Sequence, residues 1–225
     1  MHNVRIVFEV LEESEILLPG YKQASGHLVF NVQMTFERKA RWVFDGHKTE
    51  ALSHSTYAGV VSRESVRIAL TYAVLNGLDI WGADIQNAYL QVPTSEKHFI
   101  ICGPDFGLEN VGKRALIKRA LYGGKSAGRD FRNHLRACML HLNFQSCPAN
   151  PDVWMRPAKK SDGSEYYEYV LLYTDNILVI SERGEHVLRN GIGKYFELKE
   201  KSIGPPSQYL GGKMRKVMLK NGIEA

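Results

Sequence analysis

Two apolar runs flank the short polar stretch Tyr173-Thr174-Asp175-Asn176. Tyr166-Tyr167-Glu168-Tyr169-Val170-Leu171-Leu172 precedes it, and Ile177-Leu178-Val179-Ile180 follows it. Aromatic and branched residues favour strands, whereas Asp and Asn favour tight turns. The pattern therefore predicts a β-hairpin with a carboxylate at its tip. Such a carboxylate can form half of a divalent-metal site.

A second carboxylate, Asp84, follows another apolar run, Leu78-Asp79-Ile80-Trp81-Gly82-Ala83. Two strand-borne carboxylates are what a two-metal phosphoryl-transfer site requires. The second position after the hairpin's Thr174 is Asn176 and not Asp, so one neutral amide stands beside this pair.

The composition is that of a globular protein with a basic balance. The chain has 225 residues, 44% of them hydrophobic, and a net charge of +5, which modestly favours a polyanionic partner. Its three cysteines include no Cys-x-x-Cys pair, as expected in a reducing compartment. No run is long enough to cross a bilayer and no signal-peptide pattern is present, so we expect a cytoplasmic or nuclear protein without a membrane partner.

Strands and helices alternate irregularly along the chain. Helical spacing of apolar residues begins after Ser62, again over 126–142, and over 185–196, where Gly191 and Gly193 weaken the pattern. Short apolar runs at 38–44, 99–102 and 115–118 favour strands. This order predicts an α+β fold and argues against a doubly wound parallel sheet.

Five segments of the sequence, in the same order along the chain, resemble the motifs of one known family. Asp84-Ile85-Gln86-Asn87-Ala88-Tyr89-Leu90 and Tyr173-Thr174-Asp175-Asn176 resemble the first catalytic motif and the Tyr-Val-Asp-Asp motif of copia-type retrotransposon reverse transcriptases. The segment 121–131, which starts Leu-Tyr-Gly-Gly-Lys, resembles their Leu-Tyr-Gly-Leu-Lys-Gln-Ser-Pro-Arg-x-Trp. Lys-Ala-Arg-Trp-Val at 39–43 and Tyr-Leu-Gly-Gly at 209–212 resemble their fingers strand and their Tyr-Leu-Gly segment. The matches run from about residue 37 to 213, nearly the whole chain.

The resemblance implies a fingers-and-palm polymerase-like right hand with an antiparallel palm sheet backed by helices. We expect a single reverse-transcriptase-like domain over residues 1–225, with about 1–77 mainly fingers and about 78–225 mainly palm with some fingers segments. The chain ends shortly after the Tyr-Leu-Gly segment, so we expect the thumb and RNase H regions to be absent from it. Further polyprotein regions, including integrase, would lie outside this chain.

The resemblance also implies a metal site. Asp84, Asp175 and Ile85 would form the site for two Mg²⁺ ions, for which Mn²⁺ could substitute. Asn176 would belong to the catalytic motif with the two aspartates. The structural alternatives are a strand-end residue for Asp84 and a turn former for Asp175. Because an amide carries no charge to offset a divalent ion, we expect Asn176 to lower activity by about 10²-fold or more, or roughly 3 kcal/mol.

The remaining implied residues would bind the substrates. Lys39, Arg41, Tyr89 and Lys125 would contact the incoming nucleotide, where Tyr89 would select against a 2′ hydroxyl. The substrates would be deoxynucleotides and an RNA or DNA primer–template. Tyr173, Arg129 and Gly123 would contact the primer–template. A charged edge strand for Lys39 and Arg41, and a core position for Tyr89, are the structural alternatives.

Three interpretations of function stay open at this stage. The first is an RNA-directed DNA polymerase fragment of a copia-type retrotransposon, weakened by Asn176. The second is a catalytically inactive, nucleic-acid-binding remnant of the same fold. The third is an unrelated α+β enzyme that uses Asp84 and Asp175 as an acid/base pair, which would need no Mg²⁺.

Overall fold

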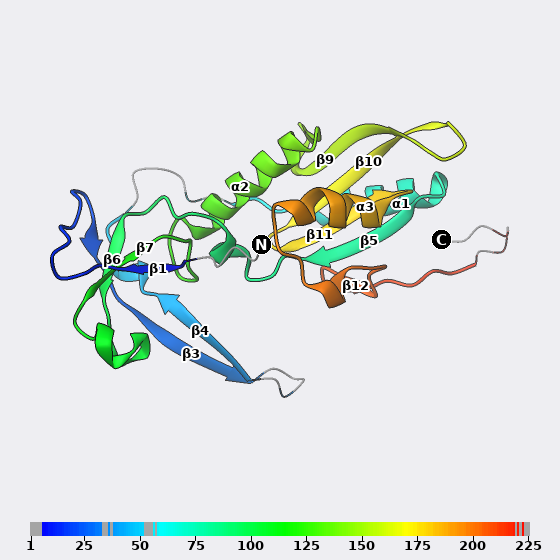
Figure 1. Ribbon diagram of the computed structural model, residues 1–225. Coiled ribbons are helices and arrows are strands. Elements are labelled where there is room, and N and C mark those ends of the chain that lie inside the picture. The colour runs from blue at the N-terminus through cyan, green and yellow to red at the C-terminus, as the bar shows by residue number, and fades with distance from the viewer. Residues whose placement is uncertain are drawn as a thin grey trace. The chain divides into compact units, whose positions relative to one another are not determined.

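The computed structural model describes residues 6–32, 36, 38–51, 56, 58–218, 220 and 222. The chain forms two compact units that are interleaved in sequence. Unit 1 comprises Met1–Ala58 and Asn87–His134, and unit 2 comprises Gly59–Gln86 and Leu135–Ala225. Both are mixtures of strands and short helices, which confirms the expectation of a mixed α and β architecture (Figure 1).

Unit 2 is built on a five-stranded antiparallel sheet in the order β5-β11-β10-β9-β8. The expected hairpin is present, because β10 and β11 pair from Tyr169↔Ile180 to Tyr173↔Asn176, with Thr174 and Asp175 as the two-residue turn. Residues 177–180 are all buried, which explains their uninterrupted apolar run. The strand bounds are β5 Asp79–Asp84, β8 Gln145–Cys147, β9 Asn150–Lys159, β10 Glu165–Tyr173 and β11 Asn176–Ser181.

Helix α1, Arg63–Leu75, begins where the sequence predicts. The Ser65 backbone N–H donates to the Ser62 hydroxyl at 3.2 Å, so serine caps the helix as expected. Its buried stripe packs against Leu178 and Ile180 of β11. Helix α3 lies against the other face of the sheet, because its Gly184 contacts Trp81, and successive strand residues point to opposite faces.

The helix expected over 185–196 is broken into three pieces. Only Gly184–His186 is α-helical (α3), followed by a π-helical turn at Val187–Gly191 and a 3-10 turn at Ile192–Lys194. The glycines weaken regular helix here, while Leu188 and Ile192 are fully buried and hold the segment by packing. A 3-10 turn at Glu200–Ser202 and a small hairpin, β12 Gln208–Tyr209 and β13 Gly212–Lys213, follow.

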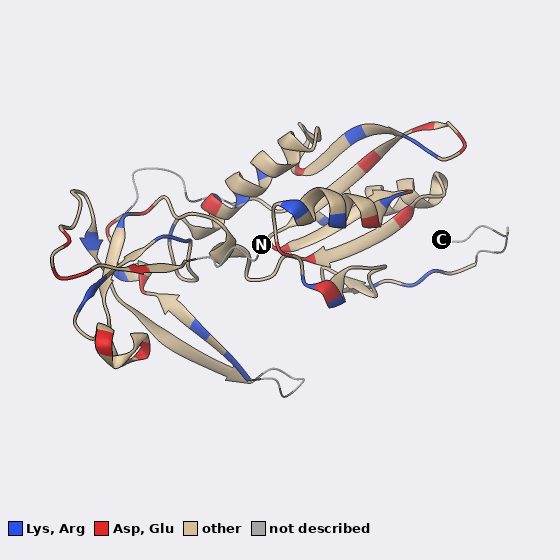
Figure 2. Ribbon diagram, viewed as in Figure 1, with Lys and Arg blue, Asp and Glu red and all other residues tan. Residues whose placement is uncertain are grey.

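Unit 1 contains a four-stranded sheet in the order β1-β7-β6-β2 and the separate ribbon β3-β4. The strand bounds are β1 Phe8–Val10, β2 Lys22–Gln23, β3 Gly26–Val32, β4 Arg38–Phe44, β6 His98–Ile101 and β7 Arg114–Ile117. The core cluster of this unit consists of Phe44, Ile100, Cys102, Ala115, Ile117 and Leu121. The basic residues of β4 are visible as blue segments in Figure 2.

Helix α2, Ala127–His141, is the longest helix among the described residues, and its N-terminal half belongs to unit 1 and its C-terminal half to unit 2. Short 3-10 turns complete the chain at Gly46–Lys48, Ala88–Gln91, Pro104–Phe106 and Leu108–Asn110. Within the described part of the chain, every helix is too short or too polar to cross a membrane.

Candidate active site

The ends of β5 and β11 bring the two expected carboxylates to one end of the unit 2 sheet. Asp84 is the last residue of β5 and lies opposite Asn176, the first residue of β11. The Ile85 backbone N–H donates to the Asp175 carbonyl oxygen at 2.8 Å, which extends the pairing into the turn. The structure thus places Asp84, Ile85, Asp175 and Asn176 together at the end of the sheet.

The hairpin turn holds a β-branched residue in an unfavourable conformation. Thr174 has φ 52°, in the left-handed region that glycine or asparagine adopts far more readily. Beside it, the Asn176 Nδ2 group donates to Asp175 Oδ1 at 3.1 Å. The amide therefore turns its N–H, and not its oxygen, toward the carboxylate. Strained residues of this kind cluster at functional sites, where surrounding structure holds them.

Asp84 is held by a segment that lies far away in sequence. Lys199 Nζ donates to Asp84 Oδ2 at 3.1 Å, and the Lys199 backbone N–H donates to the Asp84 carbonyl oxygen at 2.8 Å. In return, the Asp84 backbone N–H donates to the Ser202 hydroxyl at 2.8 Å. The sequence analysis did not single out Lys199 or Ser202, because no local pattern links them to β5.

The donor set fits a hard cation such as Mg²⁺. Carboxylate oxygens are its preferred protein ligands, and one or two of them commonly suffice when substrate phosphates complete the coordination. The Lys199 ammonium already places a positive charge at 3.1 Å from Asp84 Oδ2, so this oxygen is accessible to a cation. Across the described ranges, no group of three His, Cys, Asp or Glu side chains is gathered for metal binding.

Two of the expected nucleotide-binding residues in unit 1, Arg41 and Tyr89, are connected through an aromatic ring. Lys39 and Arg41 share one face of β4, opposite Asn31 and Val29 of β3. The Arg41 guanidinium lies 5.2 Å from the centroid of the Tyr122 ring, and the Tyr122 ring packs edge to face against Tyr89 at 5.0 Å. Tyr122 was part of a matched segment but was not assigned a role, and it joins Arg41 to Tyr89.

Lys125 and Arg129 have intramolecular partners in the structure. Lys125 Nζ donates to the backbone carbonyls of Thr49 and Glu50, at 2.7 and 3.2 Å. Arg129 pairs with Asp130 at 3.0 Å and donates to the Ser95 hydroxyl at 2.6 Å. Any contact of these two side chains with nucleic acid or nucleotide would compete with these bonds.

Gly123 and Tyr173 occupy different environments. Gly123 has φ 86°, and a Cβ atom there would lie 2.1 Å from the Phe44 carbonyl oxygen, so close main-chain packing explains the glycine. Tyr173 is the last residue of β10, next to the turn, and is exposed. Its ring is therefore available to a ligand at the same end of the sheet as Asp175.

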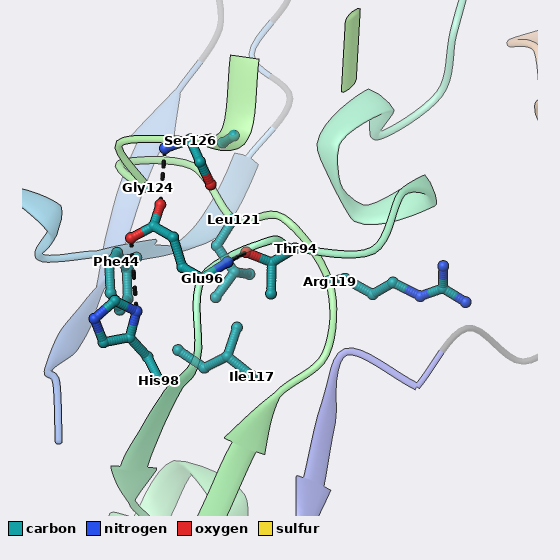
Figure 3. Close-up of a pocket in the computed structure, with 10 residues that line it drawn as sticks. Phe44, Thr94, Glu96, His98, Ile117, Arg119, Leu121, Gly124 and Ser126 are labelled. Carbon is teal, nitrogen blue, oxygen red and sulfur yellow. Dashed lines mark hydrogen bonds and ion pairs between the residues drawn. The ribbon is translucent and has the colours of Figure 1, made fainter. Parts of the chain in front are cut away.

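A small pocket in unit 1 contains a buried carboxylate (Figure 3). Glu96 Oε1 accepts the Ser126 backbone N–H at 2.7 Å, at the start of α2, and Oε2 lies 3.6 Å from His98 Nδ1. Burial lowers the pKa of His98, against the opposing effect of Glu96. Glu96 stabilises the helix N-terminus, where a negative charge is favourable. We therefore assign this pocket a structural role.

Comparisons with known proteins agree with these observations. The family model described as "Reverse transcriptase (RNA-dependent DNA polymerase)" matches residues 21–223. The chain is 28% identical over 144 residues to the Retrovirus-related Pol polyprotein from transposon RE1 of Arabidopsis thaliana, covering 63% of this chain and 10% of that protein. It is 26% identical over 178 residues to the corresponding polyprotein from transposon RE2, covering 76% of this chain and 12% of that protein.

The chain thus spans about a tenth of the length of these curated relatives. The match across most of its residues confirms the resemblance to copia-type reverse transcriptases that the five motifs indicated. The chain belongs to the reverse transcriptase (RNA-dependent DNA polymerase) family.

Proposed function

We propose that this chain is the fingers-and-palm portion of an RNA-directed DNA polymerase from a copia-type retrotransposon. The observation that carries the proposal is the pairing of Asp84 with Asn176, together with the Ile85–Asp175 backbone bond at 2.8 Å. These contacts set two carboxylates at one end of an antiparallel sheet. Unit 2 would be the palm and unit 1 the fingers. The segment Asn87–His134, which follows the first strand of the unit 2 sheet in sequence, would then belong to the fingers.

The substrates would be deoxynucleotides and an RNA or DNA primer–template. When bound, Mg²⁺ or Mn²⁺ would stabilise the attacking and leaving oxygens of the phosphoryl transfer. Asp84 and Asp175 would hold the metal through their carboxylates. Tyr173 would contact nucleic acid beside them, while Lys39 and Arg41 would bind the triphosphate and Tyr89 would lie under the sugar.

Asn176 would weaken the site for two reasons. Compared with the second Asp of the Tyr-Val-Asp-Asp motif, it lacks one negative charge. Its Nδ2 group also donates to Asp175 Oδ1 at 3.1 Å, and this hydrogen bond engages an oxygen that a metal would need. The expected cost is about 3 kcal/mol of transition-state stabilisation, or about 10²-fold in rate. Asn176→Asp would restore the charge and remove the donor.

The second candidate is a catalytically inactive, nucleic-acid-binding remnant of the same fold. The observation that favours it is that each carboxylate already has an intramolecular donor, Lys199 on Asp84 and Asn176 on Asp175. A remnant of this kind would bind a primer–template mainly through phosphates, and its affinity would fall steeply with salt.

Primer extension on an RNA template, with and without Mg²⁺, tests the proposal. The chain would be compared with Asp84→Asn, Asn176→Asp and Asp79→Asn. The last is a matched control, because Asp79 is an exposed residue at the opposite end of β5 from Asp84. We expect Mg²⁺-dependent extension that rises by about 10²-fold in Asn176→Asp, persists in Asp79→Asn and disappears in Asp84→Asn.

Each outcome has a distinct meaning. Extension by the natural chain shows that Asn176 is tolerated, whereas extension only after Asn176→Asp shows an intact scaffold with a decayed metal site. The proposal of polymerase activity is wrong if no variant extends a primer that the folded chain binds, and the remnant then explains the binding. Extension that survives Asp84→Asn or needs no metal would contradict the assigned site.

A further inference from the structure

Lys199 makes an ion pair with one of the two proposed metal ligands. Its Nζ atom lies 3.1 Å from Asp84 Oδ2, with the two side chains 45% and 35% exposed. The contact lies within unit 2 and is independent of the placement of unit 1.

The backbone of the lysine is fixed while its side chain is exposed. The Lys199 N–H donates to the Asp84 carbonyl, the Asp84 N–H donates to the Ser202 hydroxyl, and that hydroxyl donates to the Lys199 carbonyl at 2.7 Å. These bonds close a ring that ties the Glu200–Ser202 turn to the end of β5. The ammonium can therefore leave Asp84 by side-chain rotation alone, without opening the backbone.

An ammonium and a divalent ion compete for the same carboxylate. Lys199 occupies an acceptor site on Asp84, and its charge repels a second cation within a few ångströms. The charge of the Asp84, Asp175 and Lys199 group is −1, since Asn176 contributes none. A site with a net charge of −1 binds a divalent ion more weakly than the two carboxylates would without the lysine.

We propose that Lys199 is the resident counter-ion of Asp84, that a divalent cation displaces it, and that it thereby sets the metal affinity of the site. This inference rests on the proposed function, because it takes Asp84 as a metal ligand. Lys199 is a positioning residue in this scheme: it neutralises and orients Asp84 until the metal binds.

Direct metal binding tests the inference without any measurement of polymerase activity. Free Mn²⁺ would be titrated by electron paramagnetic resonance against the folded chain, with Mg²⁺ as competitor. The variants are Lys199→Gln, Lys199→Arg, Asp84→Asn and Lys201→Gln. Lys201 is the matched control, because it lies exposed on the Glu200–Ser202 turn that follows Lys199 and its loss changes the net charge equally.

We expect Lys199→Gln to lower the dissociation constant of the Asp84-dependent Mn²⁺ site about fivefold. This factor corresponds to the free energy of the strongest ion pairs between exposed side chains. Lys201→Gln should change the dissociation constant less than twofold, and Lys199→Arg should stay close to the natural chain. An unchanged or weaker site in Lys199→Gln, or an equal gain in Lys201→Gln, would overturn the inference. Mn²⁺ binding that Asp84→Asn leaves intact would overturn both the inference and the proposed metal site.

Discussion

Gly123 is confined by the main chain of a neighbouring strand. The Phe44 N–H donates to the Tyr122 carbonyl at 2.8 Å, which draws the end of β4 against the 121–124 turn. A Cβ on Gly123 would lie 2.1 Å from the Phe44 carbonyl oxygen, and its φ of 86° is one that other residues rarely adopt. Both the steric contact with the Phe44 carbonyl and the positive φ therefore disfavour any side chain at this position.

We expect Gly123→Ala to destabilise the chain more than Gly163→Ala. Both glycines have φ 86°, but nothing lies within 4 Å of a Cβ on Gly163. Gly163→Ala should cost about 1–2 kcal/mol for the backbone conformation alone, and Gly123→Ala about 2 kcal/mol more because the Phe44 carbonyl must move. Urea unfolding measures both, and equal losses would show that the turn adapts without cost.

The N-terminus of α2 is organised around a buried carboxylate. Asp130 Oδ2 accepts hydrogen bonds from the Ser95 N–H at 2.8 Å, the Ser95 hydroxyl at 2.9 Å and the Ser126 hydroxyl at 2.7 Å. Burial acts to raise the pKa of Asp130, but these donors and Arg129 outweigh it and hold the pKa below its ordinary value. The hydrogen bonds at the N-terminus of α2 thus depend on the ionised carboxylate of Asp130.

This network predicts a pH-dependent contribution to stability. The folded pKa of Asp130 is below the unfolded value of about 3.9, so its stabilisation is complete above about pH 5 and is lost as the pH falls through the folded pKa. Asp130→Asn should lower the free energy of unfolding by about 2 kcal/mol at pH 7. The difference from the natural chain should shrink below about pH 4.

Urea unfolding at pH 7, 5, 4 and 3 measures this difference, with Asp105→Asn as the control because Asp105 is exposed in a 3-10 turn. A constant difference between Asp130→Asn and the natural chain at all four pH values would contradict the assignment. The same pH trend in Asp105→Asn would show that it does not arise from the α2 network.

Among the described residues, each of the two units has a buried cysteine. Cys102 belongs to the core cluster of unit 1, whereas Cys138 is buried in the part of α2 that belongs to unit 2. Burial raises the pKa of Cys102, and it raises the pKa of Cys138 in the unit 2 part of α2 to about 12. Because both thiols are buried, they should react only after unfolding.

We expect Cys102 to become reactive at a lower urea concentration than Cys138, because the sheet of unit 1 has strands of two to four residues whereas that of unit 2 has strands of up to ten. Alkylation at pH 8 over a urea series, followed by mass spectrometry of the peptides, gives a midpoint for each thiol. Half-buried Cys147 should react before Cys138. Coincident midpoints for Cys102 and Cys138 would show instead that both units unfold in one cooperative step.

Local patterns were sufficient to predict the elements that lie wholly within a short segment. The β10–β11 hairpin, the Ser62 cap of α1 and strand β5 all form where their residues indicate, because periodicity and turn chemistry act over a few positions. The segment 184–194 differs from the expected helix, since the burial of Leu188 and Ile192 prevails over regular helical hydrogen bonding. Packing of that kind depends on residues distant in sequence.

The same division applies to the site. Motifs in the chain were enough to select Asp84 and Asp175 and to indicate the family, because those motifs are contiguous. Long-range contacts supplied what the motifs could not: the Asp84–Asn176 register, the Lys199–Asp84 ion pair, and the Arg41–Tyr122–Tyr89 cluster. Each joins residues far apart along the chain, whose proximity follows from the packing of strands and turns and leaves no local pattern of residues.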